Sequence, residues 1–145
     1  MSKIQAIAIK NRPRVPMQSI DSARISLANG ILGDFRGAQQ GRQITILSQI
    51  TWQTVCAELG AELPWTTRRA NLLVDGVEFD ASYLGKTVRI GEVELIVTEE
   101  TKPCSNMDAQ HQGLTAALTP AWRGGICCNV VKPGEIELGD PVEFA

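Results

Sequence analysis

The stretch GEVELIV, residues 91–97, carries the pattern on which the fold prediction rests. Apolar Val93, Leu95 and Val97 alternate with charged Glu92 and Glu94, which is typical of a strand with one buried face. Residues 23–27 alternate in the same way. Turn signals separate such runs, namely Asp75-Gly76, Gly91-Glu92 and Pro133-Gly134. We therefore predict a mainly β fold, a closed or partly closed β-barrel with a few short peripheral helices, because closure removes exposed strand edges.

One segment has helical rather than strand spacing. Over residues 49–59 the apolar side chains recur on one helix face, and Gly60 just past the end is a typical helix stop. Either Ser48 or Thr51 can cap the start. We predict a helix that lies against the outside of the barrel and places Cys56 in the core, since a free cysteine behaves as a small buried hydrophobe.

A second helix is predicted from about Asp108 to Leu118, where Pro120 bars continuation and Gly113 weakens the pattern. The segment 11–16 contains two prolines and two arginines and is interpreted as an exposed loop.

Length and charge restrict the classes of function. At 145 residues the chain falls in the usual range of one domain, and we expect a single domain over residues 1–145. The net charge of −2 argues against nucleic acid as a partner. No apolar stretch approaches the roughly 20 residues that cross a membrane, and residues 1–10 lack a signal-peptide pattern. We expect a cytoplasmic protein without a membrane partner.

Four cysteines and one histidine limit the possible sites. Without a signal peptide, Cys56, Cys104, Cys127 and Cys128 are expected to be free thiols, and their spacing is not that of a zinc site. On a strand, Cys127 and Cys128 point to opposite faces, one toward the core and the other toward the exterior or lumen. A multi-histidine metal site is excluded within one chain because His111 is the only histidine, and we expect it at the surface or an edge.

Several short motifs stand out from this β background. In chain order they are GILGD (30–34), GRQIT (41–45), RRANL (68–72), LG (84–85), IG (90–91), PCSNM (103–107), RGG (123–125) and GEIELGD (134–140). In this order they resemble the MOSC domain, named for the C-terminal part of molybdenum-cofactor sulfurases, over nearly the whole chain from Ala23 to Val142. The resemblance implies a β-barrel with a pocket for the pterin-based molybdenum cofactor (molybdopterin), in which Cys104 binds the metal or handles sulfur.

The chain also departs from the family pattern. Many members carry a histidine soon after the Gly-Asp pair, whereas Phe35 and Arg36 follow Asp34 here. The N-terminal β domain of the molybdenum reductases and the aminotransferase-like domain of the sulfurases are not seen. We therefore expect the stand-alone form, independent of pyridoxal phosphate, which carries, senses or uses the cofactor.

Cys104 is the residue on which a chemical function depends. It follows Lys102 and Pro103 at the end of a strand pattern and precedes the polar pair Ser105-Asn106, which predicts a loop or a helix N-terminus. Both settings, and the nearby lysine, favour the thiolate that binds soft metals and attacks sulfur. The alternative is an inert loop cysteine.

Four arginines beside strands or glycine turns can present a planar fork of donors to the phosphate of a pterin cofactor. They are Arg42, Arg68, Arg69 and Arg123. Arg69 and Arg42 are the preferred pair, expected close enough to share one anion. The alternative for each is solvated surface charge. The full predicted cofactor-binding set is Asp34, Arg42, Arg68, Arg69, Asn71, Lys102, Ser105, Asn106 and Arg123, with Cys104 as catalytic residue and metal ligand.

Two further features have alternative interpretations. Asp34 can fix an arginine or a pterin amine, or cap a turn after Gly33. The pair Gly124-Gly125 lets backbone N–H groups approach an anion, although a tight turn needs glycine equally.

Two functions from different classes follow. In the first, the chain is a cofactor-linked protein that transfers sulfur or reduces small N-hydroxylated compounds, with a redox or sulfur-donor protein as partner, because no flavin, haem or iron–sulfur ligand set is visible. In the second, it is a small-molecule or protein-binding barrel without metal, which Arg36 in place of the family's histidine favours.

Overall fold

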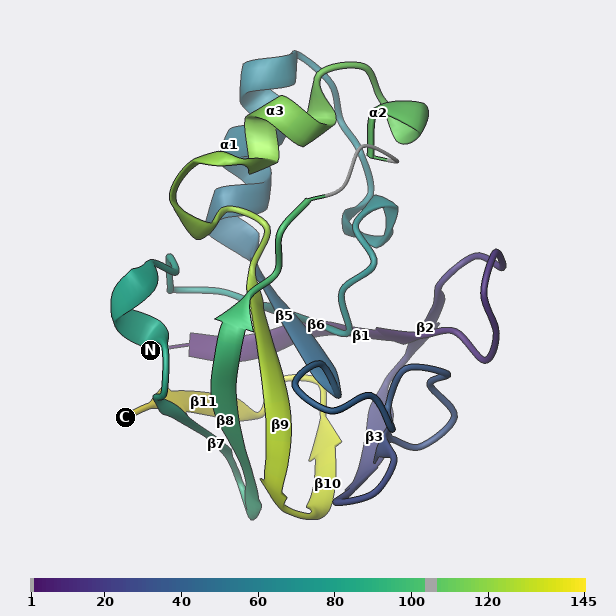
Figure 1. Ribbon diagram of the computed structural model, residues 1–145, viewed down its shortest axis with the longest axis vertical. Coiled ribbons are helices and arrows are strands. Elements are labelled where there is room, and N and C mark those ends of the chain that lie inside the picture. The colour runs from purple at the N-terminus through teal and green to yellow at the C-terminus, as the bar shows by residue number, and fades with distance from the viewer. Residues whose placement is uncertain (1, 104–106) are drawn as a thin grey trace.

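The computed structural model describes residues 2–103 and 107–145, and strands dominate it (Figure 1). The strands are β1 (Ser2–Ile9), β2 (Gln18–Ile20), β3 (Ser22–Ser26), β4 (Gly30–Ile31), β5 (Ile44–Ser48), β6 (Leu72–Val74), β7 (Thr87–Ile90), β8 (Val93–Glu100), β9 (Ile126–Lys132), β10 (Gly134–Glu137) and β11 (Pro141–Phe144). The α-helices are α1 (Gln49–Leu59), α2 (Met107–Gln110) and α3 (Leu114–Leu118), and single 3-10 turns lie at Trp65–Thr67, Ala81–Tyr83 and Pro120–Trp122.

Seven of the described strands close into a barrel. Their order is β11-β7-β8-β9-β5-β6-β1, and the ring closes because Ser2 of β1 pairs with Val142 of β11. The predicted closed barrel is confirmed. In β8 the alternation seen in the sequence places Val93, Leu95 and Val97 in the barrel core. Among the described residues, no helix has both the length and the apolar character needed to cross a membrane.

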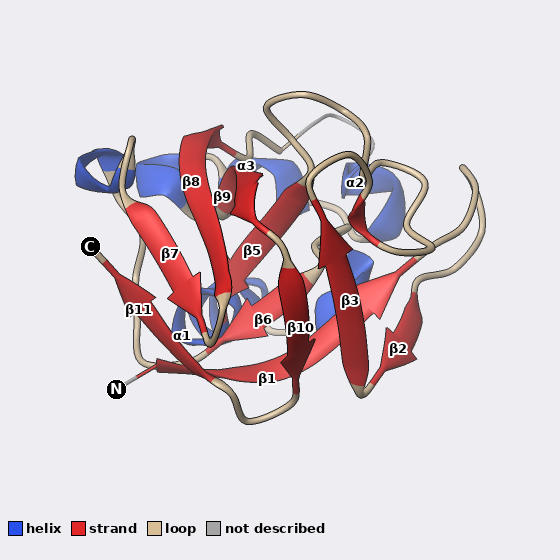
Figure 2. Ribbon diagram, turned by 90° about the horizontal axis from the view of Figure 1, so that it is seen from below, coloured by secondary structure: helices blue, strands red, loops and turns tan. Residues whose placement is uncertain are grey.

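A smaller sheet, β10-β3-β4, covers the barrel and shares its core (Figure 2). Ile25, Ile31 and Ile136 extend from its three strands into the same apolar cluster as the barrel interior. The alternation predicted for residues 23–27 continues only to Ser26, and Leu27 is 54% exposed. The strand ends there because the Ser26 hydroxyl accepts the N–H of Asn29 and turns the chain.

The predicted helix at residues 49–59 is confirmed as α1. Ser48, rather than Thr51, is its cap and accepts the Thr51 N–H at 3.2 Å, while Gly60 ends the helix with a left-handed φ of 66°. α1 and α3 pack over the outer faces of β5 and β6 and form a second apolar core. Cys56 was predicted in the core but is only half-buried at the edge of this cluster, because its sulfur faces the Leu63 carbonyl rather than the sheet.

The second predicted helix is wrong as a continuous element. Gly113 adopts a φ of 89°, which a right-handed helix does not allow, and the segment splits into α2 and α3 around it. Leu114 and Leu118 are still buried on one face of α3. His111 lies between the two short helices and is partly exposed.

The paired cysteines of β9 point to opposite faces, as predicted, but both are fully buried. Cys128 belongs to the barrel core, and burial, together with the neighbouring Cys127, raises the pKa of its thiol far above the usual range. The Cys127 sulfur lies on the outer side, 3.1 Å from the Thr101 hydroxyl oxygen. The outer face of β9 is therefore covered at this point rather than exposed.

A basic cleft at one edge of the barrel as candidate functional site

The site lies where the strand directions bring three chain segments together. β5 and β6 are parallel, with Ile46 opposite Leu72, so both begin at the same edge of the barrel. β1 is antiparallel to β6 and therefore ends at that edge. The loop between β4 and β5, residues 32–43, covers this edge, and it contributes side chains together with Lys10 after β1 and Arg69 before β6.

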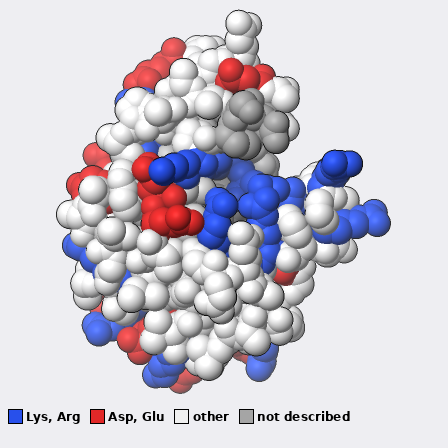
Figure 3. Space-filling view, viewed as in Figure 1, with Lys and Arg blue, Asp and Glu red and all other residues white. Residues whose placement is uncertain are grey.

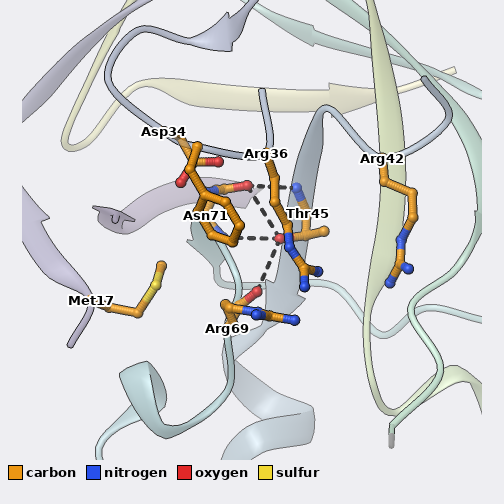
Figure 4. Close-up of a pocket in the computed structure, with 8 residues that line it drawn as sticks. Met17, Asp34, Arg36, Arg42, Thr45, Arg69 and Asn71 are labelled. Atoms are coloured by element: carbon orange, nitrogen blue, oxygen red, sulfur yellow. Dashed lines mark hydrogen bonds between the residues drawn. The ribbon is translucent and has the colours of Figure 1, made fainter. Parts of the chain in front are cut away.

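Thr45 and Asn71 form the polar node that joins the starts of β5 and β6 (Figure 4). The Asn71 side-chain oxygen accepts the Thr45 N–H at 3.0 Å, and the Asn71 N–H donates to the Thr45 carbonyl at 2.9 Å. The Asn71 amide nitrogen donates to the Ala8 carbonyl of β1 at 3.2 Å. Asn71, which was predicted to bind the cofactor, therefore uses most of its hydrogen bonds to link the start of β6 to β5 and β1. These bonds hold the floor of the cleft in place.

Asp34 caps the loop that covers the cleft. Its carboxylate accepts the N–H of Lys10 at 3.2 Å and hydrogen bonds from the backbone of Arg36 and the side chain of Asn71. Burial raises the pKa of Asp34 above its ordinary value, although these hydrogen bonds and the charge of Arg36 oppose the change. Of the alternatives open from the sequence, the turn-capping role is therefore observed.

A narrow pocket, the inner lobe, opens above the Thr45–Asn71 node. It is lined by Met17, Asp34, Phe35, Arg36, Arg42, Thr45, Arg69 and Asn71. Arg36 and Arg42 come from the covering loop and Arg69 from the segment before β6, so both members of the predicted arginine pair reach the same lobe (Figure 4).

Arg42, which lines the inner lobe, has one buried donor that makes no hydrogen bond within the described part of the chain. Its Nε is buried and has no hydrogen-bond partner among the described residues, and the nearest carboxylate oxygen, of Glu99, lies 3.8 Å away. A buried donor without a hydrogen-bond partner costs free energy and is normally completed by a bound water, an ion or a ligand. The neighbours of Arg42 are firmly held, since Gln43 bonds to Leu27, Gly37 and Val130 of the surrounding backbone.

Phe35 lies between two cations at the mouth of the inner lobe. The Lys10 amine is 5.4 Å and the Arg36 guanidinium 5.3 Å from the centre of its ring. Partial burial, together with the positive charges of Arg69 and Arg36, lowers the pKa of Lys10, while Asp34 opposes this. The mutual repulsion among these cations favours an anion in the cleft.

A wider pocket, the outer lobe, adjoins the inner lobe through Met17 and Arg69, which line both. Its other lining residues are Lys10, Arg14, Val15, Pro16, Pro64, Thr66, Thr67, Met107 and Gln110. Figure 3 shows basic side chains gathered around a hollow on this face of the molecule, with an acidic patch beside them. This grouping contrasts with the net charge of −2 of the whole chain.

Arg68 occupies a different environment from Arg69. Its side chain is buried and donates to the carbonyl oxygens of Thr101 at 2.9 Å and Gly124 at 3.2 Å, and to the Met107 sulfur at 3.7 Å. These contacts, which we call the Arg68 clamp, join the end of β8, the start of α2 and the approach to β9. The described contacts of the Arg68 guanidinium are with the fold, and its predicted part in binding a cofactor stays a prediction.

Arg123 also lies outside both lobes as the structure describes them. Its guanidinium forms a two-pronged ion pair with Glu58 of α1, at 2.7 and 2.9 Å, and bonds to the Ala117 carbonyl at 3.1 Å. The adjacent glycines allow close packing: a side-chain carbon on Gly124 would lie 2.0 Å from the Thr101 carbonyl oxygen, and one on Gly125 would lie 2.3 Å from that of Ile46. The two glycines therefore allow the backbone before β9 to lie close to the backbone at Thr101 and Ile46.

The remaining predicted residues are Cys104, Ser105 and Asn106, which lie outside the described residues, and Lys102, which is exposed beyond β8. Sequence reasoning missed Lys10, Arg14 and Phe35 as cleft residues. The basic, proline-rich composition of residues 11–16 was visible as a signal, but nothing in the sequence indicated that this loop borders the covering loop.

A family model describes the chain over most of its length. The model of the MOSC domain matches residues 32–143, which include the covering loop, Arg69 and the barrel strands from β5 to β11. The chain belongs to the MOSC domain family. No protein with a curated description shows significant sequence similarity to it.

Solved structures show that this MOSC domain shares its fold with bacterial proteins. It is similar to YuaD from Bacillus subtilis, with a TM-score of 0.82, 21% identity, and coverage of 99% of this chain and 96% of that chain. It is also similar to YiiM from Geobacillus stearothermophilus, with a TM-score of 0.81, 17% identity, and coverage of 100% and 75%. For YiiM from Escherichia coli the TM-score is 0.74 at 16% identity, with coverage of 99% and 69%.

Proposed function

We propose that this MOSC domain binds the pterin-based molybdenum cofactor in the basic cleft. In this proposal the inner lobe holds the phosphate of the cofactor, and Cys104 is the metal ligand or carries a persulfide sulfur. The observation that carries the proposal is the buried Arg42 Nε, a donor without a hydrogen-bond partner among the described residues, in a lobe that Arg36 and Arg69 also line. Guanidinium groups match the geometry and charge of phosphate oxygens.

The residues of the inner lobe fit a phosphate group in three respects. They supply guanidinium donors, they include the Thr45–Asn71 node as a rigid floor, and their one lining carboxylate, Asp34, is held by backbone N–H groups. Asp34 does not pair with Arg42, whose Nε lies 3.8 Å from a Glu99 carboxylate oxygen and has no hydrogen-bond partner among the described residues. A preorganised set of donors binds an anion with little cost in ordering.

The proposed role of Cys104 as metal ligand or sulfur carrier is supported by the sequence and by the positions of the other three cysteines. Met107, three positions after Cys104, lines the outer lobe, so the chain reaches the cleft directly after the undescribed segment. Cys127 and Cys128 are fully buried, and Cys56 belongs to α1 and lines neither lobe. Of the four thiols, Cys104 is therefore the one that we assign to metal or sulfur chemistry.

When bound, a molybdenum centre supplies two-electron chemistry, which serves the reduction of small N-hydroxylated compounds. The chain itself binds and orients the cofactor through the inner lobe and offers the Cys104 thiolate. As a reductase the domain receives electrons from a redox partner protein, and as a carrier it receives sulfur from a sulfur-donor protein.

A second candidate function is the binding of an anionic ligand without metal. Arg36, which stands where many family members have a histidine, favours it because it adds a third guanidinium to the inner lobe. This candidate needs the cleft but not Cys104.

Metal analysis of protein from a host that makes the cofactor separates the two functions. We expect molybdenum and pterin to copurify with the wild type and with Cys56→Ser, and molybdenum to be lost in Cys104→Ser, because serine is a harder and less acidic donor than cysteine. Alkylation followed by mass spectrometry should find Cys104 the fastest of the four thiols. No molybdenum or pterin in the wild type would leave only the second function. Equal molybdenum in both serine variants, with no faster alkylation at Cys104, would remove Cys104 from the proposal.

A further inference from the structure

The cleft holds more positive charge than one phosphate neutralises. Five basic side chains line its two lobes, and the opposing carboxylates are Asp34 and Glu99, the latter beside Arg42. The whole chain has the opposite balance, with 16 acidic and 14 basic residues. A bound phosphate contributes about −1.5 to −2 at neutral pH, so a surplus of about one positive charge remains.

The surplus lies in the outer lobe. Arg36 and Arg42 line only the inner lobe, Lys10 and Arg14 line only the outer lobe, and Arg69 lines both. The cleft therefore has two centres of positive charge that share one guanidinium. Neutral donors surround the second centre, since Thr66, Thr67 and Gln110 also line the outer lobe.

The two lobes differ in size and in the chemistry of their walls. The empty space, which includes open solvent, is about 1270 Å³ in the outer lobe and about 310 Å³ in the inner lobe. The outer lobe also has an apolar wall, formed by Val15, Pro16, Met17, Pro64 and Met107. An apolar wall with a few placed charges is typical of a site for an organic molecule.

The loop that carries Arg14 is restricted in conformation. Arg14 adopts a φ of 65°, one of three positive values among the described non-glycine residues, and Pro13 and Pro16 fix the backbone on either side. Such a conformation persists where the surroundings determine it. Arg14 is exposed and lines the outer lobe from this turn.

We propose that the outer lobe is a second binding site, which takes a small organic acid by placing its phosphate or carboxylate group on Lys10, Arg14 and Arg69 and its apolar body against Met17 and Met107. When the phosphate of the cofactor fills the inner lobe, this organic acid is the substrate, and in that respect the inference rests on the proposed function. Binding of the acid itself requires no metal and no cysteine.

Site-resolved anion titrations test this inference on the full chain, purified from a host that does not make the cofactor. In NMR spectra of the wild type, inorganic phosphate should shift the amide signals of Thr66 and Thr67 in the outer lobe and of Thr45 in the inner lobe. In the variant Lys10→Gln/Arg14→Gln we expect the affinity at Thr66 and Thr67 to fall about tenfold, with the affinity at Thr45 changed less than about twofold. Arg24→Gln/Arg89→Gln, which removes two exposed charges elsewhere, is the matched control.

Organic probes identify the class of ligand. Phenyl phosphate and benzoate should each bind the outer lobe at least about tenfold more tightly than neutral benzamide, and the tighter of the two identifies the acid group. The inference is overturned if Thr66 and Thr67 do not respond in the wild type, if the Lys10→Gln/Arg14→Gln variant responds equally, or if benzamide binds as tightly as the acids. Its failure would leave molybdenum binding unaffected, because that is measured through the inner lobe and Cys104.

Discussion

Arg68 and Arg69 are neighbours in sequence, yet one belongs to the Arg68 clamp and the other to the inner lobe. The Arg68 guanidinium is buried against the carbonyl oxygens of Thr101 and Gly124, whereas Arg69 lines both lobes of the cleft. The backbone at Arg68 is extended, with φ −82° and ψ 133°, so successive side chains point to opposite sides. The same chemical group therefore is buried against backbone carbonyls at one position and lines the cleft at the next.

The largest effect is expected from Gly124→Ala, which breaks the clamp. The added carbon would lie 2.0 Å from the Thr101 carbonyl oxygen and 2.9 Å from the Arg68 Nη2, so the backbone must move. We expect a loss of about 3 kcal/mol in the free energy of unfolding, measured by urea denaturation. Gly134→Ala is the control, since its added carbon meets a side-chain methyl of Val93 at 3.1 Å, and a cost below about 1 kcal/mol is expected. Equal costs would show that the clamp is not tightly packed.

Lysine substitutions sharpen the contrast between the two arginines. Arg68→Lys should cost about 2–3 kcal/mol of stability, because one ammonium cannot replace the guanidinium bonds to both Thr101 and Gly124. Arg69→Lys should change stability by less than about 0.5 kcal/mol but weaken phosphate binding about tenfold. The reverse pattern, with Arg69→Lys the less stable protein and Arg68→Lys the weaker binder, would exchange their roles.

A smaller effect is expected at Asp34, whose carboxylate opposes anions in the inner lobe. Burial raises its pKa, so protonation occurs at a higher pH than for an ordinary aspartate. As the pH falls through that raised pKa, the lobe loses a negative charge and sulfate affinity should rise. Asp34→Asn keeps the oxygen that accepts the Lys10 N–H but removes the charge. It should bind sulfate about fivefold more tightly at neutral pH and lose this pH dependence. An unchanged pH profile in the variant would assign the effect to another group.

Most of the strands and the first helix could be predicted from short-range patterns in the sequence. Alternation predicted β8, and helical spacing with the Gly60 stop predicted α1, because these signals act within a few residues. The choice between Ser48 and Thr51 as the cap was left open by the sequence. The continuous second helix failed because a single glycine, Gly113, adopted a conformation that its neighbours did not determine. The sequence also did not show that Cys127 is fully buried. Its burial depends on other segments that cover the outer face of β9, and the alternation of residues within a strand does not indicate these.

The candidate site was predictable in part. Arg42 and Arg69 were found because each stands beside a strand start, and the two strands are parallel. The sequence could not distinguish Arg68 and Arg123 from these two arginines, because their partners Thr101 and Glu58 lie 33 and 65 positions away along the chain. Lys10 reached the cleft only through the antiparallel pairing of β1 with β6, which is a property of the topology.

Cofactor content in two double variants tests the proposed role of the inner lobe most directly. Arg42→Gln/Arg69→Gln removes two guanidinium groups from the lobe, and Arg24→Gln/Arg89→Gln removes two from exposed ion pairs elsewhere. Both proteins are purified from a host that makes the cofactor, shown to be folded by thermal denaturation, and assayed for molybdenum and pterin per chain. We predict wild-type content in the second variant and on the order of a tenth of it in the first. Equal content in the two folded variants would contradict binding of the cofactor at this lobe.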